Sequence, residues 1–479
     1  MSQIPWIHPS MLLRLGGGEY IVELDEVVTG KSSTRFVLRL PQTVSRYVRE
    51  NFRLKARIEE FEGYFEDERM RVGSIDPRIL EPSGLDRMLG DVEHLLDETG
   101  SIMLTVYANL LAAALSLMAI LRLFAGEQGP GLYRDLLSGL EDVSSARPGF
   151  VLWQIAKLAR EEPQVASELR NKPLAELRVD SLPPGRTRDA LGRFLIEYGY
   201  RGVREAEIGA PRWAEDPTLM FAALRSHLDS ELDLDARERE AQRTRRDAER
   251  RLAQSVPIPL RPAVRRLLDV VRRFTRMREH LRGHVVEVLG MFRRVALETS
   301  RRIHSREPEA GADAAFFLTL AELRRVLYDE NDRVAIRVQR RRLEYERNRA
   351  LPEPPTTFVG FPPNDAYLSV ASRRMTGLAA SRGVAEGRVR ILNDPAQAAD
   401  FRPGEVLVVA AADTGWAPLF LAASAVVTEL GGPLSHAAII LREYAVPAVV
   451  NVRGATRALH EGDLVRVDGD AGIVEVLGA

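Results

Sequence analysis

Hydrophobic residues recur every three or four positions through most of the chain between residues 46 and 350. This spacing places apolar side chains on one face of an α-helix, so it predicts an almost wholly helical region. The periodic segments are 44–65, 85–125, 152–169, 191–198, 218–232 and 261–301. Breaks that contain proline, at 129–130, 183–184 and 257–259, separate several of them. We therefore expect a large, mainly α-helical domain over residues 1–350.

The first 45 residues follow a different pattern. Short strand-like pieces at 20–24 and 35–38 are separated by glycines at 16–18 and 30. Glycine is typical of the tight turns that join strands. We expect these short strands to belong to the same domain as the helices.

The pattern changes after residue 350. Five prolines between 352 and 363 predict a semi-stiff linker over 351–375. Beyond it, short apolar runs alternate with helical segments, which predicts a small α/β domain over 376–479. The apolar runs are 406–410, 425–428, 446–452, 464–467 and 473–476, and the clear helices are 418–423 and 436–444. A compact domain tethered in this way is built to move relative to its neighbour.

One segment, 102–121, carries no charged side chain and is about long enough to cross a bilayer as a helix. Polar residues such as Asn109 and Ser116 interrupt it, and charged residues such as Asp97 and Arg122 flank it. This content favours a buried helix of a large soluble domain over a transmembrane span. We expect no membrane association, and a buried apolar helix can also line a substrate pocket.

The composition excludes several classes of protein. The 479 residues are 45% hydrophobic and 28% charged, which indicates a soluble globular protein with two or three domains. The absence of cysteine excludes disulfides, thiolate nucleophiles and cysteine-ligated metals, and it fits a cytoplasmic location. The net charge of −1 predicts no nucleic-acid partner. The charged run 236–252 mixes Arg with Glu and predicts a solvated helix with internal ion pairs.

The candidate chemistry lies where an apolar strand ends at Thr428 and is followed by Gly431, Gly432, Ser435 and His436 at the start of an apolar helix. Glycines permit a tight turn and let an anion approach the main chain. Free amides at a helix start suit phosphate, and the helix dipole disfavours a positive charge on an imidazole there. A neutral imidazole can attack a phosphoryl group and form a labile covalent intermediate. On these residues alone, a structural helix-start histidine remains the alternative.

The same segment resembles the phosphohistidine signature of the phosphoenolpyruvate-utilising enzymes, T-x-x-G-G-x-x-S-H-x-A-I-x-x-R-E. Further matches to that family's swivelling domain occur, in order, at 380–387, 403–408, 413–418, 447–449 and 462–469. The resemblance implies that His436 is phosphorylated. It also implies a phosphate site shaped by Thr428, Gly431, Gly432, Ser435 and Arg442. Two departures are Leu441, where alanine is usual in the family, and Asn451, where glycine is usual.

The helical region is similar, over 198–207 and 211–217, to the substrate-binding domain of the rifampin phosphotransferases. This similarity implies a polar substrate site made by Arg201, Glu205, Glu207 and Arg212. Tyr200 stands where those enzymes usually have histidine, so the role of that histidine toward the acceptor is not carried over. The alternative for the same residues is a buried salt-bridge network between helices, because Arg and Glu rarely enter cores unpaired.

Taken together, the resemblances imply a multidomain protein with a large helical substrate-binding-like domain followed by a small α/β swivelling domain. No segment resembles an ATP-grasp domain, so we expect ATP and Mg²⁺ to be bound mainly by a separate ATP-grasp partner chain, and we identify no metal ligands in this chain. The expected activity is phosphotransfer through His436 to a hydroxyl or carboxyl group of a small apolar acceptor. The alternatives are a ligase or dehydratase that uses a phosphorylated intermediate, and a non-catalytic ligand-binding or regulatory relative.

Overall fold

The computed structural model describes residues 54, 56–140, 143–230, 234–349, 373–433 and 435–478. The strands expected within the first 45 residues lie outside the described residues. The expected linker, 351–375, also lies outside them except for its last three residues. Of these, Arg374 and Met375 already belong to the first strand of the C-terminal domain.

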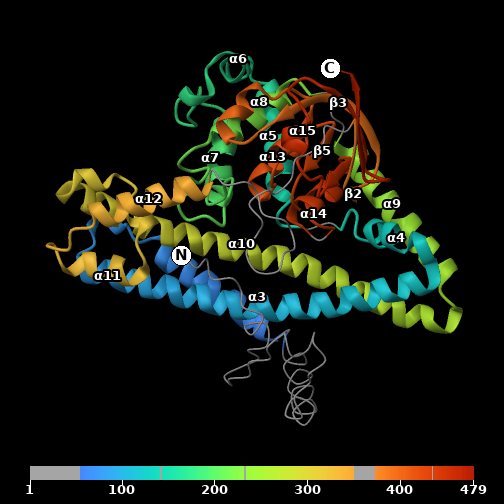
Figure 1. The fold of residues 1–479 in the computed structure, drawn as a ribbon, viewed down its shortest axis with the longest axis horizontal. Coiled ribbons are helices and arrows are strands. Elements are labelled where there is room, and N and C mark those ends of the chain that lie inside the picture. The colour runs from blue at the N-terminus through green and yellow to red at the C-terminus, as the bar shows by residue number, and fades with distance from the viewer. Residues whose placement is uncertain are drawn as a thin grey trace, which may run out of the picture.

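Two long helices, α3 (Pro82–Ala125) and α10 (Arg261–Arg306), run side by side in opposite directions beneath the rest of the molecule (Figure 1). Both were expected from the apolar spacing. Their facing sides are buried in one hydrophobic core, as ridges of apolar side chains on neighbouring helices require. The buried residues of this core include Ile102, Val106, Leu110, Leu117 and Leu121 of α3 and Leu268, Val271, Leu281 and Val288 of α10.

The outer face of α3 remains apolar and exposed. Leu111 and Leu115 are 53% and 54% exposed, whereas Leu110 and Leu117 are buried. Within the described residues, α3 and its extension to Leu136 form the one helix long and apolar enough to span a membrane, with 39% of its most apolar window buried. The expected burial of 102–121 is therefore correct for the inward face and wrong for the outward face, because α10 covers only one side of the helix.

Shorter helices build the rest of the helical region, most of them above α10, whereas α11 lies beside one end of α3 (Figure 1). Segment 152–169 is two helices, where the apolar spacing predicted one. Pro163 separates them, because proline lacks an N–H and excludes the preceding residue, here Glu162, from helical geometry. The shorter helices are α4 (Gly129–Leu136), α5 (Arg147–Arg160), α6 (Pro163–Asn171), α7 (Arg186–Tyr198), α8 (Thr218–Leu228), α9 (Leu234–Ser255), α11 (Leu320–Tyr328) and α12 (Ala335–Arg349).

The charged segment 236–252 forms most of α9, as predicted. Arg250 pairs with Asp247 one turn away, which is the expected internal ion pair. Glu249 instead pairs with Arg272 of α10 at 2.7 Å. The charges of α9 thus also hold it against its neighbour.

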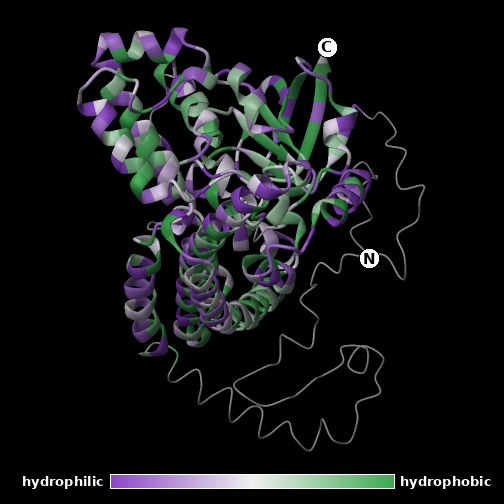
Figure 2. Ribbon diagram, turned by 90° about the vertical axis from the view of Figure 1, so that its left-hand side faces the viewer, coloured by the Kyte–Doolittle hydropathy of each residue, from purple (hydrophilic) through white to green (hydrophobic). Residues whose placement is uncertain are grey.

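The C-terminal domain is built on an eight-stranded sheet with the order β1-β8-β7-β3-β4-β5-β6-β2. Strands β3, β4, β5 and β6 are parallel, and the remaining pairs are antiparallel. Strands β4, β5 and β6 are buried at every position, as strands covered on both faces should be. Figure 2 shows hydrophobic residues interrupted by hydrophilic ones on strands near the C-terminus, in agreement with the partly exposed β7 and β8. The strands are β1 (Arg374–Thr376), β2 (Leu378–Ser381), β3 (Val384–Ile391), β4 (Val406–Val409), β5 (Ala425–Thr428), β6 (Ala448–Val450), β7 (Leu464–Asp468) and β8 (Ile473–Gly478).

The helices of this domain follow the parallel strands. Both predicted helices are present, as α13 (Ala417–Phe420) and α14 (His436–Glu443). A third, α15 (Ala455–Ala458), was missed because a single turn carries no apolar period. The fold class predicted from the sequence, a large helical region followed by a small α/β domain, is confirmed.

The two parts share a continuous apolar core. Residues of α5 and α8, such as Leu152 and Phe221, and residues of the C-terminal domain, such as Phe420 and Tyr444, belong to one buried cluster. The Tyr444 hydroxyl donates a hydrogen bond of 2.5 Å to the Ala146 carbonyl, across the boundary. The structure therefore shows the small domain docked on the helical region.

Candidate functional site

His436 is the first residue of α14, at the carboxyl end of the parallel strand β5. The helix begins there because the Ser435 side chain accepts a hydrogen bond of 3.3 Å from the Ala438 amide and so caps the helix. The preceding strand is fully buried, so its end is fixed by the core. The site therefore rests on a rigid strand and a capped helix start.

The two glycines before His436 differ in their surroundings. Gly431 has a φ of +143°, and a Cβ there would lie 3.3 Å from Ser435 Oγ and 3.4 Å from Val450 Cβ. A Cβ at Gly432 would meet no described atom within 4 Å. Gly431 is therefore required by the turn itself, whereas Gly432 leaves open space beside the helix start.

The His436 ring is held by an acid from the other part of the chain. Its Nδ1 lies 2.9 Å from Oε1 and 3.0 Å from Oε2 of Glu279 on α10. Glu279 also accepts a hydrogen bond of 2.7 Å from the Ser145 hydroxyl, and Arg278 lies 3.8 Å from its Oε1. The histidine of the small domain thus completes a polar site inside the helical region.

Glu279 is fully buried, with a side-chain exposure of 0%. Burial alone would raise its pKa, but the His436 ring, the neighbouring Arg278 and the Ser145 hydrogen bond together lower the pKa to about 2. The group is therefore a carboxylate at neutral pH. A carboxylate can only accept at Nδ1, so Nδ1 carries a proton and Nε2 is the ring nitrogen left for other contacts.

Nε2 of His436 is the ring nitrogen that Glu279 does not engage. The histidine side chain is 15% exposed, so the ring is neither free nor sealed in the core. A carboxylate that fixes the tautomer of a reacting imidazole is a recurring device in covalent catalysis. The geometry thus supports a nucleophilic nitrogen at the start of α14.

Two other residues expected at the phosphate site make contacts within the C-terminal domain in the docked structure. The Thr428 hydroxyl donates to the Leu430 carbonyl at 2.8 Å and shapes the turn. Arg442, on the last turn of α14, donates from Nη1 to the Ala380 carbonyl of β2 at 3.2 Å. Burial lowers the pKa of its guanidinium to about 10. Arg442 therefore ties α14 to the edge of the sheet in this structure.

Of the four residues expected at a polar site in the helical region, the structure brings three together. Arg201 and Glu205 form a buried ion pair at 3.2 Å, and Nη1 of Arg212 donates to the Glu205 carbonyl at 2.9 Å. Glu207 is exposed and caps its own turn by accepting from the Gly209 amide. Glu207 thus lies apart from the cluster.

The small domain contacts this cluster through Asp413. Its Oδ2 accepts a hydrogen bond of 3.3 Å from the Glu205 amide, while Oδ1 accepts from the Gly415 amide at 3.0 Å. Burial, together with the nearby Glu205 carboxylate, raises the pKa of Asp413 to about 7. Gly415 lies so close to Gly202 that a Cβ would be 2.2 Å from the Gly202 carbonyl oxygen. The loop 413–415 is therefore a docking contact.

A cavity of about 840 Å³ opens beside this interface. Its wall combines aromatic side chains with charged ones, and it includes His280, the residue after Glu279 on α10. His436 itself is not part of that wall. Among the lining residues are Phe150, Trp153, Tyr200, Arg201, His284 and Glu287.

Glu279 was missed by the sequence analysis. The sequence feature that could have revealed it is an acidic residue at the helical spacing of apolar positions. Thr275, Glu279 and Val286 share one face of α10, and all three are buried. An ionised group in such a position needs a partner. Its partner, His436, is 157 residues away, so only the fold identifies the pair.

Comparison with known proteins agrees with this architecture. Residues 401–472 match the mobile domain of PEP-utilising enzymes, and residues 101–279 match the fourth domain of rifampicin phosphotransferase. The C-terminal domain belongs to the family of mobile domains of PEP-utilising enzymes. Both matched segments contribute to the site, since one ends at Glu279 and the other contains His436.

Curated relatives of this chain carry different names. The chain is 32% identical over 346 residues to rifampicin phosphotransferase of Streptomyces sviceus, covering 69% of the chain and 39% of the relative. It is 32% identical over 289 residues to prodigiosin synthesizing transferase PigC of Serratia marcescens, covering 59% and 32%. The chain thus spans about a third to two fifths of the length of these relatives.

Proposed function

We propose that this chain carries a phosphoryl group on Nε2 of His436 and transfers it to an acceptor held by the helical region. The observation that carries the proposal is the contact between His436 Nδ1 and the buried Glu279 carboxylate. A structural helix-start histidine needs no ionised partner from another domain. An imidazole whose Nε2 must be a nucleophile does need its tautomer fixed.

The proposed reaction has two steps. First, the Nε2 lone pair attacks a phosphorus atom of ATP, so that an N–P bond forms and a P–O bond to the nucleotide leaving group breaks. Second, an oxygen of the acceptor attacks the same phosphorus, the N–P bond breaks and its electron pair returns to Nε2. A hydroxyl acceptor releases its proton to solvent. Helix-start amides and the arginines near Glu279 stabilise the charge of the transferring group.

In this scheme ATP and Mg²⁺ are bound by an ATP-grasp partner chain, and His436 swings between that partner and the helical region. The docked arrangement is then the one in which His436 transfers its phosphoryl group to the acceptor, because His436 contacts Glu279 there. The proposed acceptor is a small, largely apolar molecule with a hydroxyl or carboxyl group. The cavity beside Phe150 and Trp153 has the size and the mixed lining that such a molecule requires.

The test is phosphohistidine detection by mass spectrometry on the full chain mixed with ATP, Mg²⁺ and its ATP-grasp partner. We expect a phosphoryl group on His436, and none in His436→Ala. His460→Ala is a matched control, since His460 is exposed and lies in the same domain. Equal labelling of His436→Ala and wild type would contradict the proposal.

A second candidate retains the phosphohistidine but condenses the phosphorylated acceptor with a second molecule, as a ligase does. It is favoured by the match to a relative named as a prodigiosin synthesizing transferase. The two candidates differ in their product. A stable phosphate ester from the reconstituted enzyme supports simple phosphotransfer, whereas free phosphate together with a condensed product supports the ligase. A dehydratase would release free phosphate and an unsaturated product.

A further inference from the structure

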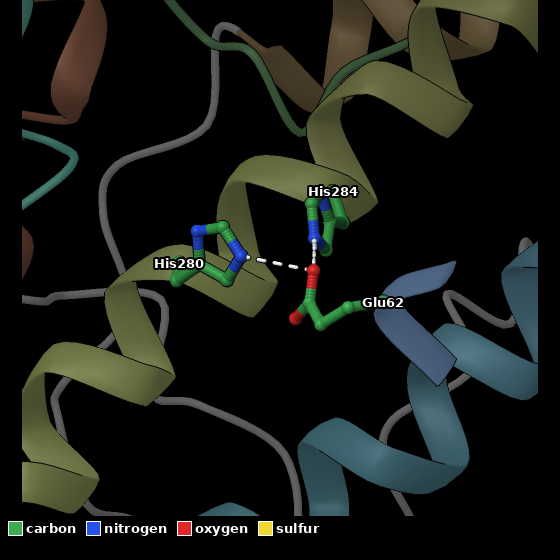
Figure 3. Close-up of side chains that lie close together, drawn as sticks. All are labelled: Glu62, His280 and His284. Atoms are coloured by element: carbon green, nitrogen blue, oxygen red, sulfur yellow. Dashed lines mark hydrogen bonds and ion pairs between the residues drawn. The ribbon is translucent and has the colours of Figure 1, made fainter. Parts of the chain in front are cut away.

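Two histidines on the cavity wall and a glutamate beside them form a cluster that takes no part in the proposed phosphotransfer. His280 and His284 are one turn apart on α10, and Glu62 comes from the helix at residues 56–73 (Figure 3). Two histidines at positions i and i+4 present their rings on the same helix face, a spacing that zinc sites use. The sequence analysis did not single out this His-x-x-x-His pattern.

The three side chains converge on one point. Glu62 Oε2 lies 3.1 Å from Nε2 of His280 and 2.8 Å from Nε2 of His284 (Figure 3). All three candidate ligand atoms lie within 4.8 Å of one another. Ligands of a tetrahedral zinc ion at ordinary bond lengths are about 3.4 Å apart. The two separations between Glu62 and the histidines are therefore within about 0.6 Å of the spacing that such an ion requires.

The second nitrogen of His284 is placed as the outer nitrogen of a metal-bound histidine would be. Nδ1 is buried, has no hydrogen-bond partner among the described residues, and lies 4.0 Å from Oε1 of Glu287. If a neutral His284 donated Nε2–H to Glu62, its bare Nδ1 lone pair would face the Glu287 carboxylate. A metal at Nε2 instead leaves the ring proton on Nδ1, directed at that carboxylate. Carboxylates hold the outer nitrogen of zinc-bound histidines in this way.

The ring of His284 is already held in position. It stacks on Phe65 with a centroid distance of 3.8 Å and an interplanar angle of 29°. His280 meets it edge-on at 4.5 Å. Because the His284 ring is fixed by packing, little of its side-chain entropy is lost when a metal binds.

We infer that Glu62, His280 and His284 bind a divalent first-row metal ion, best matched by Zn²⁺. Two imidazole nitrogens and one carboxylate oxygen form a three-ligand set of the kind that leaves a fourth position for water or a bound molecule. Both histidines belong to the wall of the 840 Å³ cavity. The open position can therefore take an oxygen of a molecule bound in that cavity. That last step, unlike the metal site itself, rests on the proposed function.

The experiment is calorimetric titration of the chelator-treated full chain with Zn²⁺, without nucleotide. We expect one Zn²⁺ per chain, with affinity at least about 10-fold weaker in His280→Ala and in Glu62→Gln. His280 is the variant of choice because its side chain is half exposed, so its removal spares the fold. Glu287→Gln is expected to weaken binding about 10-fold through the outer nitrogen of His284. Circular dichroism confirms that each variant is folded.

His304→Ala is the matched control, since His304 is exposed on the same helix and outside the cluster. It should bind Zn²⁺ like wild type, as should His436→Ala. Co²⁺ in place of Zn²⁺ should give the visible absorption of a tetrahedral site in wild type but not in His280→Ala. Binding that is absent in wild type, or equal in wild type and His280→Ala, overturns the assignment. Because no ATP is present, these outcomes are independent of His436 phosphorylation.

Discussion

Nδ1 of His436 and the carboxylate of Glu279 are in hydrogen-bond contact at 2.9 and 3.0 Å although the two residues are 157 positions apart. One belongs to the α/β domain and the other to the longest helix of the helical region. The contact exists only when the domains are docked. In the proposed reaction, transfer to the acceptor needs the docked arrangement, whereas loading of His436 from ATP takes place at the partner chain. A change to this contact should therefore affect the transfer step and not the loading step.

Glu279→Gln should slow transfer to the acceptor and leave loading from ATP nearly unchanged. The amide can donate to Nδ1 and so favour the tautomer with a protonated Nε2, and in a comparable catalytic pair such a change costs up to about 10⁴-fold. Single-turnover quench experiments that follow phosphohistidine and product separately would measure both steps. Equal slowing of both steps would show that Glu279 does not act only in transfer to the acceptor. Ser145→Ala should give a smaller effect in the same direction.

Substitution of the two glycines before His436 should have different consequences. Gly431→Ala is expected to destabilise the small domain by about 1–3 kcal/mol, because a φ of +143° strains an alanine. Gly432→Ala should leave stability within about 0.5 kcal/mol, since its Cβ meets open space. If that space admits the phosphoryl group, Gly432→Ala will still reduce His436 labelling. Thermal denaturation and phosphohistidine mass spectrometry distinguish the two effects.

Domain docking should weaken as the pH rises toward 7. In the docked protein the pKa of Asp413 is about 7, whereas its ordinary value is 3.8. Between about pH 4 and 7 docking is therefore accompanied by uptake of a proton on Asp413. Protonation of Asp413 stabilises the docked state fully below about pH 4, and this stabilisation is lost as the pH rises through about 7. Asp413→Asn should remove the dependence. Fluorescence energy transfer between cysteines introduced into the two domains reports it, because the chain has no cysteine of its own.

Glu279 acts in the opposite sense at lower pH. Its pKa in the docked protein is about 2, below its ordinary value of 4.5. The ionised Glu279 therefore stabilises the docked state above about pH 4.5, and this stabilisation is lost as the pH falls toward 2. The Asp413 experiment is therefore best read between pH 5 and about 8, where Glu279 stays ionised.

Removal of one partner of the Arg201–Glu205 pair should test whether it is structural. Both side chains are buried, at 2% and 0% exposure, and an unpaired buried charge typically costs about 3–5 kcal/mol. Arg201→Met is therefore expected to lower the free energy of unfolding by that order. Unchanged stability together with weaker acceptor binding would assign Arg201 to the substrate site instead. Glu207→Gln is the control, since Glu207 is exposed and outside the cluster.

The sequence alone determined much of the architecture. The apolar period of 3.6 residues located α3 and α10, and the run of glycines before His436 located the start of α14. These features are local, because they depend on spacing within one helix or one turn. The same local reasoning failed at Pro163, where backbone chemistry overrode the apolar spacing.

Only the tertiary structure decided which side chains meet. It paired His436 with Glu279, brought Arg201, Glu205 and Arg212 together, and left Glu207 apart. It also placed Glu62 against His280 and His284, which are 218 and 222 residues away. Such contacts depend on the packing of helices that are distant along the chain. One sequence records the period of each helix but not the neighbour against which its face is packed.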